Sequence, residues 1–249
     1  METKERLRWF LKDSVRRLVD FSKTPQNLGY PPPPLQKPVS DGDKIVALPE
    51  RGRCPTAASL PVGEAMERRC SRRKYSQAAL SLEELSFLLW ATQGIRGAAD
   101  PVRTYRTVPS AGCRHPLETY LAVFRVQGLE TGVYRYLPLQ HSLVEVARRD
   151  DLETAMIRAA NNQPFAGKGA VTFIWSAVPE RTEWRYAEAS VKVIALDAGH
   201  VCQNLYLACE AIGAGTCAIA AYDQELADGI ISVDGTEEFA VYMAPVGKV

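Results

Sequence analysis

The chain has 249 residues, of which 46% are hydrophobic, so it can bury a sizeable core within one domain. Its 30 lysines and arginines are balanced by 29 aspartates and glutamates, which excludes the global positive field of a protein that binds nucleic acid or an anionic membrane. We therefore expect neither kind of partner, and any anion site must be local.

The cysteines are scattered and lack the paired spacing of a zinc ribbon or the density of a secreted disulfide scaffold. We expect reduced thiols and no metal site. The N-terminus is charged from its first residues and carries no apolar stretch long enough for a signal peptide or a membrane span. These features predict a cytoplasmic protein.

The first 60 residues differ in composition from the rest of the chain. Residues 3–22 place apolar side chains at helical spacing among basic ones, which predicts one amphipathic helix that needs a partner surface. Residues 24–40 are rich in proline, which favours extended backbone and excludes helix. We therefore expect residues 1–60 to form a helix and a proline-rich arm, and residues 61–249 to form the domain. An SH3-type ligand is the alternative reading of the prolines.

The region after residue 60 alternates between helical and strand patterns. Ser81 and Glu84 form a capping box that opens a helix ending near Gly94, and the unbroken apolar run 170–178 predicts a strand buried on both faces. Helices enclosing a mainly antiparallel sheet make an α+β fold. The further predicted helices are 62–69, 152–161, 183–212 and one capped by Asp223, and the further strands are 119–126, 132–137, 142–146, 216–220 and 239–244.

Five cations and a serine lie together in the segment from Arg68 to Lys74. Guanidinium groups bind phosphate oxygens through two hydrogen bonds, and a serine adds a neutral donor, so the segment suits a compact phosphate. The alternative is a solvated basic turn, which is the usual fate of a run of charge.

Three segments carry longer motifs. They read Arg-Cys-Ser-Arg-Arg-Lys-Tyr at 69–75, Pro-Ser-Ala-Gly-Cys-Arg-His-Pro-Leu-Glu at 109–118 and Asp-Ala-Gly-His-Val-Cys-Gln-Asn-Leu at 197–205. The first is similar to the phosphate-binding signature of the nitroreductase family, and the third resembles that family's interface helix. The second resembles a motif of the SagB-type dehydrogenase subgroup of the family, although Pro-Ser-Ala-Gly alone would indicate an ordinary turn.

This resemblance implies an intertwined homodimer with an FMN at each subunit interface. Cys70 stands where many relatives have arginine or histidine, so one cation of the family pattern is replaced. In the implied site, residues of 69–73 hold the phosphate and ribityl chain, residues 109–112 approach the isoalloxazine edge, and residues 219–221 lie near N5. Gln163 would contact the pyrimidine edge, and Lys248 would be a further phosphate cation. The implied cofactor-binding residues are Arg69, Cys70, Ser71, Arg73, Pro109, Ser110, Ala111, Gly112, Gln163, Ile219, Ala220, Ala221 and Lys248.

The resemblance also implies the reaction. NAD(P)H would reduce FMN and leave, and a small acceptor such as a nitroaromatic or a quinone would take the hydride. One alternative is oxidation of thiazolines or oxazolines in a modified peptide, for which relatives use a lysine–tyrosine pair as base. Here Arg185 and Tyr186 occupy those positions. Arginine does not readily give up a proton, which makes this alternative weaker. Two others are an FMN storage protein and thiol catalysis at Cys70 or Cys113. We expect His200 to be structural on a buried helix.

Overall fold

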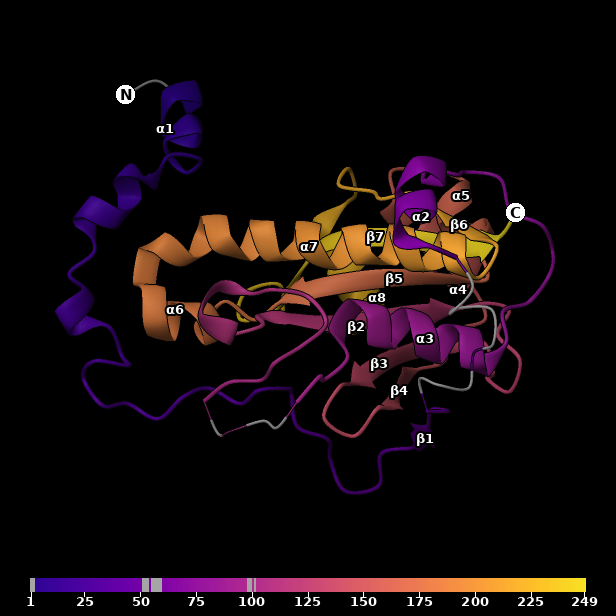
Figure 1. Ribbon diagram of the computed structural model, residues 1–249, viewed down its shortest axis with the longest axis horizontal. Coiled ribbons are helices and arrows are strands. Elements are labelled where there is room, and N and C mark those ends of the chain that lie inside the picture. The colour runs from indigo at the N-terminus through magenta and orange to yellow at the C-terminus, as the bar shows by residue number, and fades with distance from the viewer. Residues whose placement is uncertain (1–2, 51–53, 55–59, 98–99, 101) are drawn as a thin grey trace.

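The computed structural model describes residues 3–50, 54, 60–97, 100 and 102–249. A seven-stranded sheet in the order β1-β4-β3-β2-β5-β7-β6 lies between two layers of helices (Figure 1). Every neighbouring pair of strands is antiparallel. The α+β prediction is therefore confirmed.

The centre of the sheet is the pair β2 (Leu117–Val123) and β5 (Val171–Ala177), in which every residue is buried. Tyr120 lies opposite Ile174, and Leu121 lies opposite Phe173. Because side chains alternate between the faces of a strand, Leu121 and Phe173 enter one core cluster, whereas Tyr120 and Ile174 enter the other. The predicted two-sided buried strand is confirmed.

Three of the other strands begin where the sequence predicts, and one of the predicted strands is wrong. β3 (Gly132–Leu137) and β4 (Ser142–Ala147) follow β2 as a meander, and β7 (Phe239–Lys248) extends four residues beyond the predicted end. The strand predicted at 216–220 is wrong: β6 (Ala214–Thr216) ends where the prediction begins, and beyond it only Ile219 pairs, in an isolated bridge to Met243. The three-residue β1 (Ile45–Ala47) was not anticipated, because so short a strand has no readable period.

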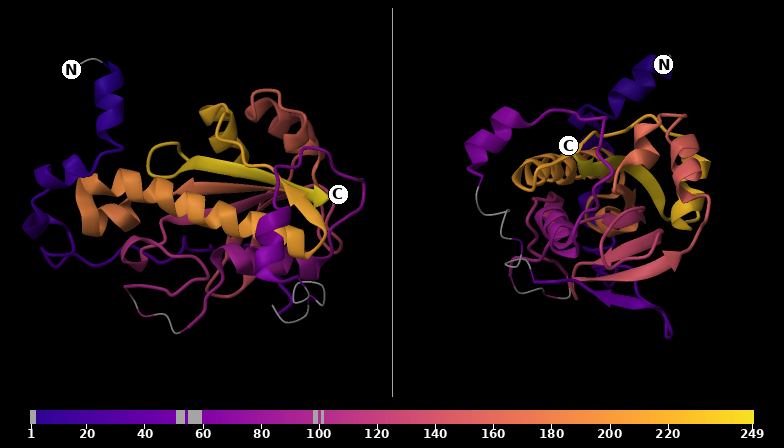
Figure 2. Two further views of the ribbon diagram at one scale, coloured as in Figure 1. Left: turned by 45° about the horizontal axis from the view of Figure 1, so that its top comes forward. Right: turned by 90° about the vertical axis from the view of Figure 1, so that its right-hand side faces the viewer.

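Helices cover both faces of the sheet. In the right-hand view of Figure 2, α3 (Leu82–Gln93) and α7 (Ser190–Ala211) lie on one side, and α4 (Leu152–Ala159), α5 (Phe165–Lys168) and α8 (Gln224–Ile231) lie on the other. The short α2 (Val62–Arg68) packs on α7. Both predicted caps are present, since Ser81 and Glu84 form the capping box and Asp223 accepts from the Leu226 N–H at 3.0 Å.

The long helix predicted at 183–212 is wrong in one respect, because it is two helices. α6 (Glu180–Tyr186) ends at Ala187, whose φ of 46° and ψ of −132° lie outside helical values. A 3₁₀ turn at Ala187–Ala189 then leads into α7. The apolar spacing continues through the break, so the pattern alone resembles one helix. The break turns α6 away from the axis of α7.

The single helix predicted at 3–22 is also wrong. α1 (Thr3–Trp9) is followed by 3₁₀ helices at Asp13–Leu18 and Phe21–Lys23, and Lys12 between them is extended, with φ −84° and ψ 148°. No residue of α1 is buried, and the helix projects from the body of the molecule (Figure 1).

The proline-rich arm is tied to the sheet by buried charges. Glu118 on β2 accepts from the Lys37 N–H at 2.7 Å, and Arg135 on β3 donates to the Lys37 and Pro38 carbonyls at 2.7 and 2.8 Å. Arg181 on α6 forms an ion pair with Glu118, and all three charged side chains are buried. Burial alone would raise the pKa of Glu118, but Arg181 and Arg135 outweigh it and hold the pKa below its ordinary value. This network joins arm, sheet and α6.

We predict that Glu118→Ala destabilises the protein strongly, because it leaves two buried guanidinium groups without their shared anion. The expected loss is about 3–5 kcal/mol of unfolding free energy in urea titration. Glu130→Ala is the matched control, because Glu130 pairs with Arg148 at the surface and its loss should cost about 1 kcal/mol or less. Equal losses for the two variants would contradict the prediction.

Candidate functional site

The basic segment after α2 is held by its backbone and by the hydroxyl of Tyr75, which follows it. Arg72 donates its N–H to the Thr216 carbonyl at 2.9 Å, and Ser71 forms a parallel bridge with Thr216. The Tyr75 hydroxyl donates to the Arg72 carbonyl at 2.7 Å. The segment therefore runs along β6, at the edge of the sheet.

The predicted phosphate ligands gather around two aromatic rings. The Arg69 guanidinium lies 5.4 Å from the centroid of Tyr206, whose hydroxyl is 3.0 Å from Ser71 Oγ. Arg73 lies 5.7 Å from the centroid of Phe165. Neither Arg69 nor Arg73 makes an ion pair with any residue that the structure describes. Two positioned guanidinium groups and a hydroxyl are thus available to an anion, and Cys70 between them is exposed.

Residues 219–221 of the predicted site lie next to this cluster. Ala218 donates its N–H to the Tyr206 hydroxyl at 2.9 Å, so Tyr206 contacts both the basic segment and the chain that leads to Ala220. Ala220 and Ala221 are exposed, and their N–H groups donate to no acceptor in the described part of the chain. Ile219 is buried and paired with Met243. Small exposed residues with unpaired N–H groups allow a flat ligand to approach the backbone closely.

Two outlying predicted residues have different surroundings. Gln163 donates to the Ala221 carbonyl at 3.2 Å and to the Ala160 carbonyl at 3.0 Å, which places it beside the strand residues. The Lys248 ammonium is instead engaged inside the protein, where it pairs with Glu84 and donates to the Ile212 carbonyl at 2.6 Å. A phosphate would have to compete with Glu84 for it.

The Pro109–Gly112 loop is held by a residue that sequence reasoning missed. Ser110 Oγ donates to Asp197 on α7 at 2.5 Å and accepts from the His115 N–H at 2.9 Å. Burial raises the pKa of Asp197, and this effect is larger than the lowering of the pKa by the hydrogen bonds from Ser110 and Ala111. Burial, with Arg106 close by, lowers the pKa of His115 to about 3, so that imidazole is neutral at pH 7. Asp197 is the first residue of the segment 197–205 that resembles the family's interface helix, and this position was the signal in the sequence that could have identified it.

Arg185 and Tyr186 lie against this same loop. Gly112 has a φ of +58°, and a Cβ built on it would stand 2.8 Å from the Tyr186 hydroxyl oxygen and 2.9 Å from Arg185 Cδ. Arg185 also lies over the Tyr186 ring, at 5.7 Å. The end of α6 and the loop therefore form one surface.

The loop and the basic segment lie on opposite sides of α7. Asp197 holds the loop and Tyr206 holds the basic segment, and Tyr206 lies nine positions after Asp197 along the helix. Nine positions correspond to about 900° of rotation and about 13.5 Å of rise, which places the two side chains on opposite faces. Within one subunit the structure therefore does not bring the two predicted halves of the FMN site together.

His200 differs from its expectation. Its side chain is 47% exposed and its Nδ1 lies 3.9 Å from Asp197 Oδ1, so it is not the buried structural histidine that the sequence suggested. The face of α7 on which it stands is open in the single subunit.

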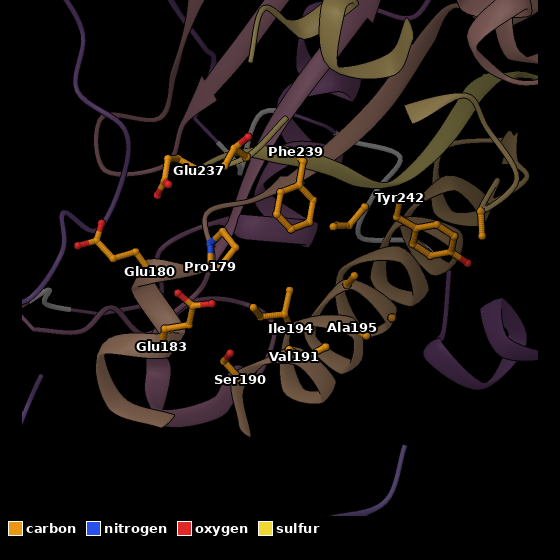
Figure 3. Close-up of a pocket in the computed structure, with 15 residues that line it drawn as sticks. Pro179, Glu180, Glu183, Ser190, Val191, Ile194, Ala195, Glu237, Phe239 and Tyr242 are labelled. Carbon is orange, nitrogen blue, oxygen red and sulfur yellow. The ribbon is translucent and has the colours of Figure 1, made fainter. Parts of the chain in front are cut away.

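A pocket of about 750 Å³ opens between α6, α7 and β7 (Figure 3). Its walls include Val191, Ile194, Phe239 and Tyr242, and Ala220 of the predicted cofactor site lines it as well. Sequence reasoning did not anticipate this pocket, because its lining comes from segments about 60 residues apart.

Comparison with solved structures establishes the class of fold. A Ralstonia eutropha protein assigned by name to the nitroreductases shares 24% identity and a TM-score of 0.69, over 88% of this chain and 94% of that one. A chain of the Escherichia coli microcin synthetase McbBCD complex with truncated pro-MccB17 bound shares 17% identity and a TM-score of 0.61, over 100% and 98%. The NADPH:FMN oxidoreductase of Vibrio harveyi shares 13% identity and a TM-score of 0.53, over 75% and 68%.

Sequence comparison then establishes the family. The model of the nitroreductase family matches residues 65–248, and the chain belongs to this family. A Methanocaldococcus jannaschii protein assigned to the nitroreductases by name is 33% identical over 195 residues, 78% of this chain and 94% of the relative. The trifolitoxin-processing protein TfxB of Rhizobium leguminosarum is 28% identical over 177 residues, which are 65% of this chain and 46% of that relative. Among the described residues, no helix is long and apolar enough to cross a membrane.

We predict that Gly112→Ala strains the loop, because alanine resists a positive φ and its Cβ would collide with Tyr186. The expected cost is about 1–2 kcal/mol of unfolding free energy. Gly229→Ala is the control, since a Cβ on this α8 glycine meets nothing within 4 Å and should leave stability unchanged or raise it. Urea titration of both variants measures the difference, and an unaffected Gly112→Ala protein would refute the strain.

Proposed function

We propose that this protein is an FMN-dependent oxidoreductase that takes hydride from NAD(P)H and passes it to a small acceptor. The observation that carries the proposal is the connection through Tyr206, which joins the free cations of the basic segment to the exposed backbone at Ala220 and Ala221. The family match and the named activity of the Vibrio harveyi relative support it.

The residues present fit FMN by their chemistry. Arg69, Ser71 and Arg73 offer charge-assisted and neutral donors to a phosphate, and no described carboxylate pairs with either arginine. Ala220 and Ala221 offer unpaired N–H groups to the polar edge of a flat ring, and Gln163 stands beside them. When bound, FMN supplies hydride transfer at its isoalloxazine ring. The chain itself has to bind it, orient it and admit substrates.

Two copies of the chain are proposed to complete each site. The Pro109–Gly112 loop cannot reach the basic segment of its own subunit, because α7 lies between them. In a two-fold dimer that pairs the exposed sides of α7, the loop of one copy faces Ala220 and Ala221 of the other. Arg185 and Tyr186, which pack on the loop, would then stand on the substrate side of the partner's cofactor.

We predict that Arg69→Gln and Arg73→Gln each weaken FMN binding about tenfold to a hundredfold, which is the range for loss of a charge-assisted hydrogen bond. Riboflavin, which lacks the phosphate, should bind all variants alike. Flavin fluorescence titration measures both. Arg68→Gln is the control, because Arg68 already pairs with Glu64. Equal losses for FMN and riboflavin would mean that these arginines do not hold the phosphate.

The composite site predicts complementation between inactive variants. A double variant Arg69→Gln/Arg73→Gln and a loop variant Gly112→Val each lack one half of the site. Random mixing at equal amounts makes half of the dimers mixed, and each mixed dimer regains one intact site, so activity should return to about a quarter of wild type. Steady-state NAD(P)H oxidation after co-refolding measures it. Activity that never exceeds the sum of the separate variants would place the whole site in one subunit.

A second candidate is azoline oxidation on a modified peptide. It is favoured by the identity to the trifolitoxin-processing protein and by the contact of Tyr186 with the candidate loop. Arg185, in place of a readily deprotonated lysine, weighs against it. Anaerobic stopped-flow with NADH or NADPH separates the candidates: rapid bleaching of bound flavin supports the first, and bleaching only by a thiazoline peptide supports the second. A storage protein would bleach with neither.

A further inference from the structure

The pocket between α6, α7 and β7 has two chemically different ends. Figure 3 shows Glu180, Glu183 and Glu237 together on one side, and Phe239, Ile194 and Tyr242 toward the other. Ala220 also lines the pocket, and it follows Ile219, which bridges to Met243 next to Tyr242 of the apolar wall. A molecule in this pocket would therefore extend from the redox centre toward a group of carboxylates.

The three carboxylates are not neutralised within the described part of the chain. Glu180, Glu183 and Glu237 make no ion pair with any residue in the described ranges, and Glu188 adds a fourth carboxylate in the adjoining groove, which also contains Glu183. Partial burial raises the pKa of Glu183, and the neighbouring Glu237, Glu180 and Glu188 raise it further. Like charges held together in this way favour an external cation.

A buried serine gives an independent sign of a ligand. Ser190 lines the pocket at the first turn of α7, its side chain is 1% exposed, and its Oγ finds no hydrogen-bond partner among the described residues. A buried hydroxyl without a partner costs free energy, so a polar group in the pocket is the natural compensation. In Figure 3 its oxygen lies on the side of the residue that faces Glu183.

We infer that this pocket selects an acceptor substrate with an apolar body and a cationic group, such as an amine or a quaternary ammonium ion, whose charge rests among Glu180, Glu183 and Glu237. The inference rests on the proposed function, since it names the substrate class of that site. It also implies that anionic acceptors are disfavoured, because the same carboxylates repel them.

The basic N-terminal segment of a second copy is the competing occupant. α1 carries exposed Leu7 beside Arg6 and Arg8, so its charge also complements the carboxylates. Two observations favour a substrate: the volume of about 750 Å³ is typical of small-molecule sites, and Ala220 places the pocket beside the candidate redox centre.

The test compares three nitroaromatic acceptors of similar size that differ in charge: (4-nitrobenzyl)trimethylammonium, 4-nitrobenzyl alcohol and 4-nitrobenzoate. We expect kcat/KM for the cation to exceed that for the anion at least about tenfold at low salt, mainly through KM, and the ratio to fall as salt screens the carboxylates. Glu183→Gln/Glu237→Gln should bring the ratio close to one and change kcat/KM for the neutral alcohol less than for the cation. Glu50→Gln/Glu130→Gln, which removes the same charge elsewhere, should leave the ratio as in wild type.

Calorimetric binding of benzyltrimethylammonium provides a readout that needs no turnover. Wild type should bind it at least about tenfold more tightly than Glu183→Gln/Glu237→Gln does. Equal affinity, or an equal effect of the control pair, would overturn the inference even in an active flavoenzyme. If light scattering shows that the Glu183→Gln/Glu237→Gln protein and a variant lacking residues 3–18 both lose the dimer, and benzyltrimethylammonium binds wild type and the Glu183→Gln/Glu237→Gln protein equally, the second copy occupies the pocket. Absence of flavin reduction would instead refute the proposed function, and calorimetry would still decide the inference.

Discussion

The packing of α7 along the sheet is the constraint on which the arrangement of this protein depends. One side of the helix contributes Ile194, Val201 and Leu205 to the core formed with β2, β5 and α3. Since this side is fixed against the sheet, the positions of Asp197 and Tyr206 around the helix are fixed as well. The loop and the basic segment are attached at these two residues, so the burial of one helix determines where both halves of the candidate site lie.

The buried charges around Glu118 position α6, the element that carries the candidate residues Arg185 and Tyr186. Arg181 belongs to α6 and is paired with Glu118 on the central strand, while the carbonyls of the arm accept from Arg135 on the other side of the same network. α6 is further held by Trp184, whose Nε1 donates to the Tyr30 carbonyl at 3.0 Å. The arm, though it lies outside the family match, thus contributes to the position of Arg185 and Tyr186. Isolated surface ion pairs could not fix an element in this way, because water competes for them.

Much of the fold was readable from local patterns. The capping box at Ser81, the strand at 132–137 and the doubly buried strand near 171 were all predicted within a few residues, because each depends on a short-range rule of capping or periodicity. The break at Ala187 and the end of β6 were not, because apolar residues continue through both. The same holds for the candidate site, whose residue types were identified from the sequence. The contacts of Ser110 with Asp197 and of Lys248 with Glu84 were not predicted, because they join residues 87 and 164 positions apart.

The sequence by itself determined the family, the α+β class and the chemical character of the candidate site, since these depend on which residues follow one another along the chain. Only the tertiary structure decided that α7 separates the basic segment from the Pro109–Gly112 loop, and that three carboxylates meet an apolar wall next to Ala220. The physical reason is that a helix presents its residues to opposite sides at a spacing of a few positions, and the sheet determines which side is buried. Neighbours in space across α6, α7 and β7 leave no pattern along the chain.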